Sequence, residues 1–249
     1  MIFESIALIL CAYAVAIFAT VAGFGISTLL IPIMAFFLDL KTVIAIVACF
    51  HLFNNIFKVR LFKQNINKEI FLYFGVPSLI FAFIGANLLV SLPTNGLKQL
   101  LAAFLLGYAA VQLFKPKRKR RGSLIELNTE HFKFHSILGG IISGFLTGVI
   151  GMGGAVRGAF LINYNVQKEV YIATSALIAL VVDLARIPAY FSNQLIDLKK
   201  YGVLLIILIA VAYAGVRTGK LFVNTIDPKK FQNYVYCALV IVSILILMK

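Results

Sequence analysis

Residues 134–167, FHSILGGIISGFLTGVIGMGGAVRGAFLINYNVQ, contain no Asp, Glu, Lys or Arg except Arg157. As one α-helix these 34 residues would reach about 51 Å, whereas the hydrocarbon core of a bilayer is about 30 Å thick. The middle of the run reads Gly151-Met152-Gly153-Gly154. We therefore predict a helix that is broken or re-entrant at these glycines, although glycines also serve simply to let helices pack closely.

Residues 5–38 form a second run of the same kind. They also number 34, they carry no Asp, Glu, Lys or Arg, and Gly23-Phe24-Gly25 interrupts them. Unwound backbone at membrane depth is tolerated only where protein buries it or water reaches it. Each run is therefore expected to place a broken helix in the protein interior.

The composition of the whole chain agrees with a membrane location. Hydrophobic residues make up 61% and charged residues 13%, and the mean hydropathy is +0.99. A soluble domain carries about twice this charged fraction, so a water-soluble enzyme, a disordered chain and a secreted disulfide scaffold are excluded. We predict an all-α polytopic membrane protein, because only internally bonded helices satisfy the backbone in lipid. The apolar runs indicate about eight transmembrane helices, at residues 5–38, 42–57, 70–97, 99–114, 134–167, 170–196, 201–216 and 231–248.

The net charge of +14 is concentrated in one loop. Six Lys and Arg side chains lie within residues 115–121, between two apolar runs. On a soluble chain such an excess would indicate nucleic acid, but beside membrane spans it indicates a cytoplasmic loop, with anionic lipid headgroups as another partner. We predict a first four-helix repeat in residues 1–114, a basic cytoplasmic linker in 115–133 and a second four-helix repeat in 134–249.

The two halves share an order of features. A shift of 128 residues superposes the two glycine breaks and then the polar helix that follows each of them. Interrupted helices at corresponding positions of two repeats are typical of secondary transporters, whose site lies between the repeats. The superposed pairs are Gly23 with Gly151, Gly25 with Gly153, Asn55 with Asp183, and Lys58 with Arg186.

Polar side chains in the predicted membrane segments are functional candidates because their burial is costly. His51, Asn54, Asn55 and Lys58 follow the spacing i, i+3, i+4 and i+7, which places them on one helical face. They suit a substrate site or a polar interface between packed helices, and snorkelling to the membrane surface is another role for Lys58. His51 is a candidate to carry a coupling proton.

The second half carries the charged candidates. Arg157 follows the glycine break, where a half-helix N-terminus would offer free N–H groups and a partial positive charge. Its guanidinium matches an oxyanion, although a salt bridge to Asp183 is an alternative role. Arg186 is able to snorkel or to form a structural pair with Asp183. The predicted substrate-binding residues are Gly23, Gly25, Ser27, Thr28, His51, Asn54, Asn55, Gly151, Gly153, Gly154, Arg157, Thr174, Ser175, Asp183 and Arg186.

Common enzyme motifs are absent from the sequence, which has no Gly-x-Ser-x-Gly, no His-Glu-x-x-His and no P-loop. We therefore expect a transporter of a small anion rather than an enzyme, without a cofactor, a metal or a nucleic-acid partner. Two alternatives are an anion channel and a membrane enzyme that acts on a lipid-like substrate, with His51 and Asp183 as acid and base. A proton or another ion is the expected coupling partner, and a homo-oligomer is compatible with the Phe-rich surface.

Several motifs resemble the sulfite exporter TauE/SafE family, also described as DUF81-type membrane permeases. The stretches GFGISTLLIPIMAFF (23–37) and GMGGAVRGAFLINYN (151–165) look like its two glycine signatures. IGANLLVSLPTNGLKQLL (84–101) and TGKLFVNTIDPKKFQNYV (218–235) are similar to its later helix-loop-helix pattern. The resemblance implies a multi-pass permease, expected in the bacterial inner membrane, for small sulfur-containing anions such as sulfite, sulfoacetate or another organosulfonate.

Overall fold

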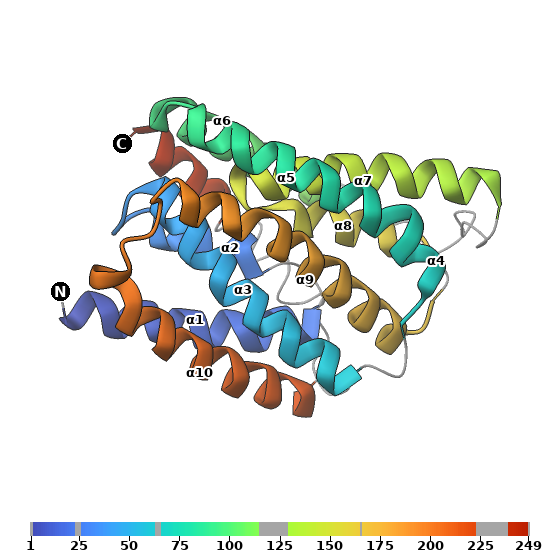
Figure 1. The fold of residues 1–249 in the computed structure, drawn as a ribbon, viewed down its shortest axis with the longest axis horizontal. Coiled ribbons are helices and arrows are strands. Elements are labelled where there is room, and N and C mark those ends of the chain that lie inside the picture. The colour runs from blue at the N-terminus through green and yellow to red at the C-terminus, as the bar shows by residue number, and fades with distance from the viewer. Residues whose placement is uncertain are drawn as a thin grey trace.

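A computed structural model describes residues 2–22, 26–62, 66–114, 129–164, 166–222 and 239–248. Every regular element in these ranges is helical (Figure 1). Residues 23–25, with the predicted first glycine break, and residues 115–128 of the basic linker lie outside the described residues. The elements are α1 (Ile2–Ala22), α2 (Ile26–Met34), α3 (Leu40–Phe62), α4 (Lys68–Ile70), a π-helical turn η2 (Phe71–Gly75), α5 (Val76–Ser91), α6 (Thr94–Phe114), α7 (Glu130–Ile150), α8 (Gly153–Leu161), α9 (Lys168–Ser192), α10 (Leu198–Phe222) and the helix Leu239–Met248.

Six helices are long and apolar enough to cross a membrane, so the chain is an all-helical integral membrane protein. They are α3, the continuous helical stretch Lys68–Ser91, α6, α7, α9 and α10. The described residues also contain two shorter apolar helical stretches, Leu8–Thr20 within α1 and Leu239–Met248, which are not among these six. The predicted number of eight spans is therefore not confirmed.

The boundary between the third and fourth predicted spans lies earlier than the sequence pattern indicated. α5 ends at Ser91 and α6 begins at Thr94, so the predicted runs 70–97 and 99–114 divide at Leu92-Pro93. Leu92 is extended, with ψ 140°, because a following proline disfavours the α conformation in the residue before it. The charged residues from Lys68 onward belong to the helix as its first turn, and the Asn67 side chain caps that turn.

The long run around Gly151 is a helical hairpin, which confirms the predicted break in residues 134–167. α7 ends in front of Gly151, whose φ of +74° lies in the left-handed region that favours glycine. α8 then runs back along α7. The Ser143 hydroxyl donates to the Gly153 carbonyl at 2.9 Å, and the hydroxyls of Ser136 and Tyr164 are 2.8 Å apart. As the chain advances from Gly153 to Tyr164, the residue of α7 that it contacts changes from Ser143 to Ser136, nearer to the start of α7. The chain therefore turns back on itself, and the hairpin is re-entrant.

α5 and α7 pack in parallel with their backbones in direct contact (Figure 1). A Cβ at Gly144 would lie 2.2 Å from the carbonyl oxygen of Ser78, and one at Gly148 would lie 2.3 Å from that of Ala82. Glycines at a spacing of four are the usual way to bring membrane helices this close. The contact holds the hairpin of α7 and α8 against α5.

α3 and α9 run in opposite directions through the middle of the molecule, between the pair α5–α7 and the pair α1–α10 (Figure 1). Phe62, at the end of α3, packs with Ile172 near the start of α9. His51, in the middle of α3, faces Asp183 in the middle of α9. This antiparallel pairing brings the polar residues of the two halves together in the interior.

Candidate functional site

The predicted polar face of α3 is buried. His51, Asn54, Asn55 and Lys58 are all at most 8% exposed. The Lys58 ammonium donates to the carbonyl of Ala19 at 3.3 Å, so its side chain turns into the protein. The Asn55 amide donates to the carbonyl of His51 at 2.8 Å, within its own helix.

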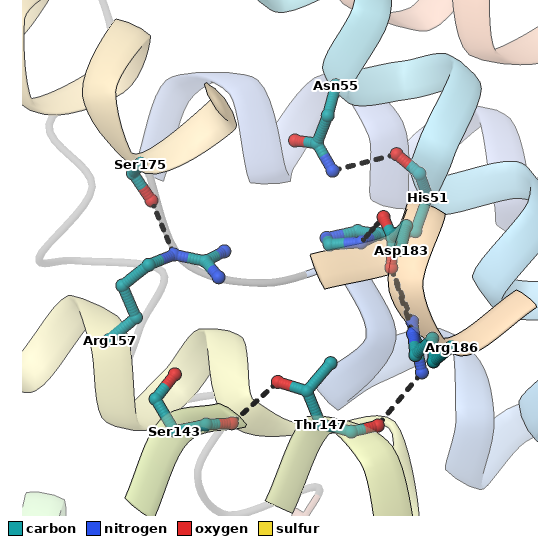
Figure 2. Close-up of polar contacts among 8 residues, drawn as sticks. All are labelled: His51, Asn55, Ser143, Thr147, Arg157, Ser175, Asp183 and Arg186. Carbon is teal, nitrogen blue, oxygen red and sulfur yellow. Dashed lines mark hydrogen bonds and ion pairs between the residues drawn. The ribbon is translucent and has the colours of Figure 1, made fainter. Parts of the chain in front are cut away.

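Asp183 is bound by two partners (Figure 2). Its Oδ2 lies 2.7 Å from Nδ1 of His51, and its Oδ1 accepts from Nε of Arg186 at 2.9 Å. Nη2 of Arg186 is 2.8 Å from the same Oδ1, and both side chains of this ion pair are fully buried. Snorkelling of Arg186 is therefore wrong, because its guanidinium is held by a carboxylate inside the bundle.

The buried pair also closes the broken end of α7. Nη1 of Arg186 donates to the main-chain carbonyl of Thr147 at 3.0 Å, and the Tyr190 hydroxyl donates to that of Gly148 at 2.7 Å. A helix that stops in the interior leaves its last carbonyls without intrahelical donors, and a cation there also suits the helix dipole. The pair of Asp183 and Arg186 thus has a structural role.

Arg157 lies across the interior from this cluster and is only 4% exposed. Its Nε donates to the Ser175 hydroxyl at 2.9 Å. Among the residues that the structure describes, no carboxylate forms an ion pair with Arg157. The alternative of a salt bridge to Asp183 is therefore wrong, since Arg186 occupies that carboxylate. Figure 2 shows the guanidinium of Arg157 extending toward the side of His51.

Some of the other predicted residues have a hydrogen-bond partner among the described residues, and others do not. The hydroxyls of Ser27 and Thr28, in the first turn of α2, and the amide of Asn54 are buried without a hydrogen-bond partner among the described residues. The Thr174 hydroxyl, in contrast, accepts from the backbone N–H of Asn67 at 2.9 Å. Thr174 therefore holds the segment before α4, while its neighbour Ser175 accepts the hydrogen bond from Arg157.

The glycines after the break set the distance between α7 and α8. Gly153 and Gly154 form the first turn of α8, and no described side chain caps this N-terminus. A Cβ at Gly153 would lie 1.9 Å from both the carbonyl oxygen of Ser143 and the hydroxyl of Thr147. Only glycine permits this approach.

A separate cavity of about 250 Å³ lies where α2 passes into α3. It contains none of the predicted site residues, so the polar cluster and this cavity are distinct features. Within the described ranges no three His, Cys, Asp or Glu side chains are grouped as metal ligands. The cavity is lined by Ala35, Phe36, Phe37, Leu38, Asp39, Leu40, Thr94, Lys98, Leu101 and Ile246.

The model of the sulfite exporter TauE/SafE family matches residues 8–246, nearly the whole chain. The chain belongs to the sulfite exporter TauE/SafE family. No curated protein and no solved structure matches it. The resemblance drawn from the glycine signatures is thereby confirmed, and membership of a transporter family makes the chain a membrane permease.

Three residues of this TauE/SafE protein that bond at the broken helix were not among the predicted site residues: Ser143, Thr147 and Tyr190. Ser143 and Thr147 are polar side chains in the same apolar run as Arg157, four residues apart and facing α8. Their spacing before the glycine break was a usable signal. Tyr190 carried no such signal, because its role depends on the carbonyl that α7 leaves free.

Proposed function

We propose that this TauE/SafE protein is a secondary transporter for a small sulfur-containing oxyanion, such as sulfite, sulfoacetate or another organosulfonate, and that Arg157 binds the anion. One observation carries the proposal. Arg157 is a buried guanidinium that is fixed by the neutral hydroxyl of Ser175 at Nε and forms no ion pair with a described carboxylate. No described residue hydrogen-bonds to its Nη1 or Nη2 groups, which would bind the ligand.

A buried cation without a counter-ion is costly, by about 2.5–3.5 kcal/mol on membrane-insertion scales. Arg186 avoids that cost through Asp183 and the Thr147 carbonyl. Among the described residues Arg157 has one hydrogen-bond partner, Ser175, and it interacts electrostatically with Tyr171 and Asp183. An oxyanion in a bidentate contact with the guanidinium would neutralise Arg157 and match its planar geometry.

The surroundings of Arg157 suit an anion as well. α8 begins with Gly153 and Gly154 and has no side-chain cap, so its first N–H groups and its dipole favour negative charge. α2 packs against α8, and the unpaired hydroxyls of Ser27 and Thr28 lie in its first turn. These hydroxyls are hydrogen-bond donors for the oxygens that Arg157 does not reach.

The matching lengths of two pairs of helices support alternating access. α1 and α7 each have 21 residues, and α2 and α8, which follow them, each have nine. Two such units suit repeats in residues 1–114 and 134–249 around a cytoplasmic linker at 115–133, with the anion bound between them. Rocking of one unit against the other would expose the site to each side in turn.

A binding screen on the purified full-length protein tests the proposal. Sulfite, thiosulfate, sulfoacetate, taurine, sulfate and acetate are ranked by thermal shift, with wild type compared with Arg157→Gln. A ligand at 100 times its dissociation constant adds about 2.7 kcal/mol of stability. We expect a sulfur oxyanion to rank first and the variant to lose the shift. Equal shifts in both proteins would overturn the role of Arg157.

Transport is measured with the best ligand in proteoliposomes. The vesicles are loaded with an excess of unlabelled anion, and labelled anion is added outside. Accumulation of the labelled anion inside the vesicles indicates alternating access. Flux without such counterflow indicates a channel, and chemical conversion of the compound without flux indicates an enzyme. Either of these two results would replace the proposed mechanism.

A further inference from the structure

His51 is the least buried member of its cluster with Asp183 and Arg186. Its side chain is 7% exposed, whereas those of Asp183 and Arg186 are 0% exposed. Nδ1 lies 2.7 Å from Asp183, so Nε2, on the other side of the ring, is left for another partner. Figure 2 shows the imidazole of His51 and the guanidinium of Arg157 extending toward one another, and the two groups interact electrostatically.

Asp183 determines which nitrogen of His51 carries a proton. Its carboxylate already accepts from Arg186, so it also acts as the acceptor for Nδ1–H of His51. A neutral imidazole with its proton on Nδ1 has only a lone pair on Nε2. That lone pair repels an anion bound by Arg157, whereas the N–H of a protonated His51 would donate to it.

The charged groups that face His51 come from two elements. Asp183 and Arg186 belong to α9, and Arg157 belongs to α8. α2, which also packs against α3, has no ionisable residue. The described ionisable groups of α6 and α10 do not interact with His51. Cys49 and Lys58, on α3 itself, interact with the cluster through Asp183, Arg186 or Arg157. The charged groups that influence the protonation of His51 are therefore Asp183, Arg186 and Arg157, and of these Arg157 is the one proposed to bind the anion.

We propose that Nε2 of His51 forms the second contact to the anion at Arg157, and that this contact exists only after His51 has taken up one proton, so that each anion binds together with one proton. The inference rests on the proposed role of Arg157 as the anion receptor. The proton comes from water and goes to Nε2, while Nδ1 keeps its own proton and continues to donate it to the Asp183 carboxylate. No covalent bond to the anion forms or breaks.

The coupling follows from charge. Without an anion, a protonated His51 would face the positive Arg157, which disfavours proton binding. When the anion lies between them, it offsets the positive charges of both Arg157 and protonated His51. Because linkage is reciprocal, the factor by which the proton raises the affinity for the anion equals the factor by which the anion raises the affinity for the proton. Anion and proton would then move as a pair.

The test measures binding and proton uptake on the full chain in detergent. Sulfite and thiosulfate are titrated between about pH 6 and pH 8, the range in which histidine changes charge. Thiosulfate does not titrate there, so any proton bound with it is taken up by the protein. We expect affinity to fall about tenfold per pH unit on the alkaline side, with uptake of about one proton per anion in weakly buffered solution.

Two histidine variants test whether the pH dependence comes from protonation of His51 or from the loss of any histidine. His51→Gln keeps a polar side chain of similar size but cannot titrate, so its affinity should be weak and independent of pH. His135→Gln is the matched control, because His135 lies on α7, pairs with Tyr164 and does not interact with the cluster. It should keep the wild-type pH slope.

The outcomes distinguish this inference from the function on which it rests. Proton uptake with thiosulfate, lost in His51→Gln, supports it. Binding that requires Arg157 but takes up no proton, or a pH slope that persists in His51→Gln, overturns the proton switch and leaves the anion receptor standing. If neither anion binds at any pH, the proposed function fails and the switch with it. If His51→Gln does not fold, the proton count on the wild-type protein decides alone.

Discussion

Arg186 of α9 donates a hydrogen bond of 3.0 Å to the main-chain carbonyl of Thr147, at the end of α7 where the helix breaks. The same guanidinium holds Asp183 through Nε and Nη2. One fully buried cation therefore pairs with a carboxylate one turn away on its own helix and also stabilises the free end of the re-entrant hairpin. Arg157, in contrast, bonds within the described residues to no carboxylate and to one neutral hydroxyl. The two arginines should therefore respond differently to substitution.

Replacing Arg186 should destabilise the fold. Arg186→Gln leaves Asp183 without its cation, which we expect to lower the free energy of unfolding by about 3–5 kcal/mol. Asp183→Asn should have a similar effect, and the double variant should recover part of the loss because the two groups are coupled. Thermal unfolding in detergent measures this. Arg217→Gln on the exposed face of α10 is the control, and equal stability of all variants would contradict the structural role.

Replacing Arg157 should weaken anion binding and leave the fold intact. Arg157→Lys keeps the charge but loses the bidentate geometry, so affinity for the anion should fall about tenfold or more. Arg157→Gln removes the charge and should reduce affinity further. Binding is measured by thermal shift and by isothermal titration. Wild-type affinity in both variants, with normal expression, would show that Arg157 is not the receptor.

Gly153→Val should separate α8 from α7. The added Cβ would overlap with the Ser143 carbonyl and the Thr147 hydroxyl, an overpacking that typically costs about 1–3 kcal/mol. We expect transport to be lost while the protein still inserts in the membrane. Gly107→Val on α6 is the matched control, because a Cβ there meets no atom within 4 Å. Normal flux in Gly153→Val would show that the close approach is not needed for transport.

Ser175 and Thr174 are neighbours with different partners, and their variants should differ accordingly. Ser175→Ala frees Nε of Arg157, and the loss of one hydrogen bond of about 1 kcal/mol corresponds to roughly fivefold weaker anion binding. Thr174→Val removes the acceptor of the Asn67 N–H, so it should lower stability with little effect on affinity. Thermal stability and anion affinity are measured for both variants. If both variants changed stability and affinity in the same way, the separate roles of Ser175 and Thr174 would be refuted.

The sequence by itself determined the class of the molecule and the position of one break. The low charge and the long apolar runs leave no alternative to helices in a membrane, because lipid offers the backbone no hydrogen-bond partner. Length and glycine position locate the break at Gly151, since a run of 34 residues is too long for one crossing. The buried face from His51 to Lys58 also followed from helical spacing alone. These inferences are local, which is why they hold without tertiary information.

Only the tertiary structure decided which polar groups are partners. From the sequence, Asp183 was a possible partner of Arg157 or of Arg186, and a catalytic pair with His51 was a further alternative. The packing of α3 against α9 brings His51 to Asp183 across 132 positions of the chain, while the re-entrant turn of α8 directs Arg157 to Ser175. No pattern of spacing encodes such pairs, because they depend on where a hairpin folds back and how closely its glycines let it pack. That geometry leaves Arg157 without a described carboxylate and gives Arg186 its own.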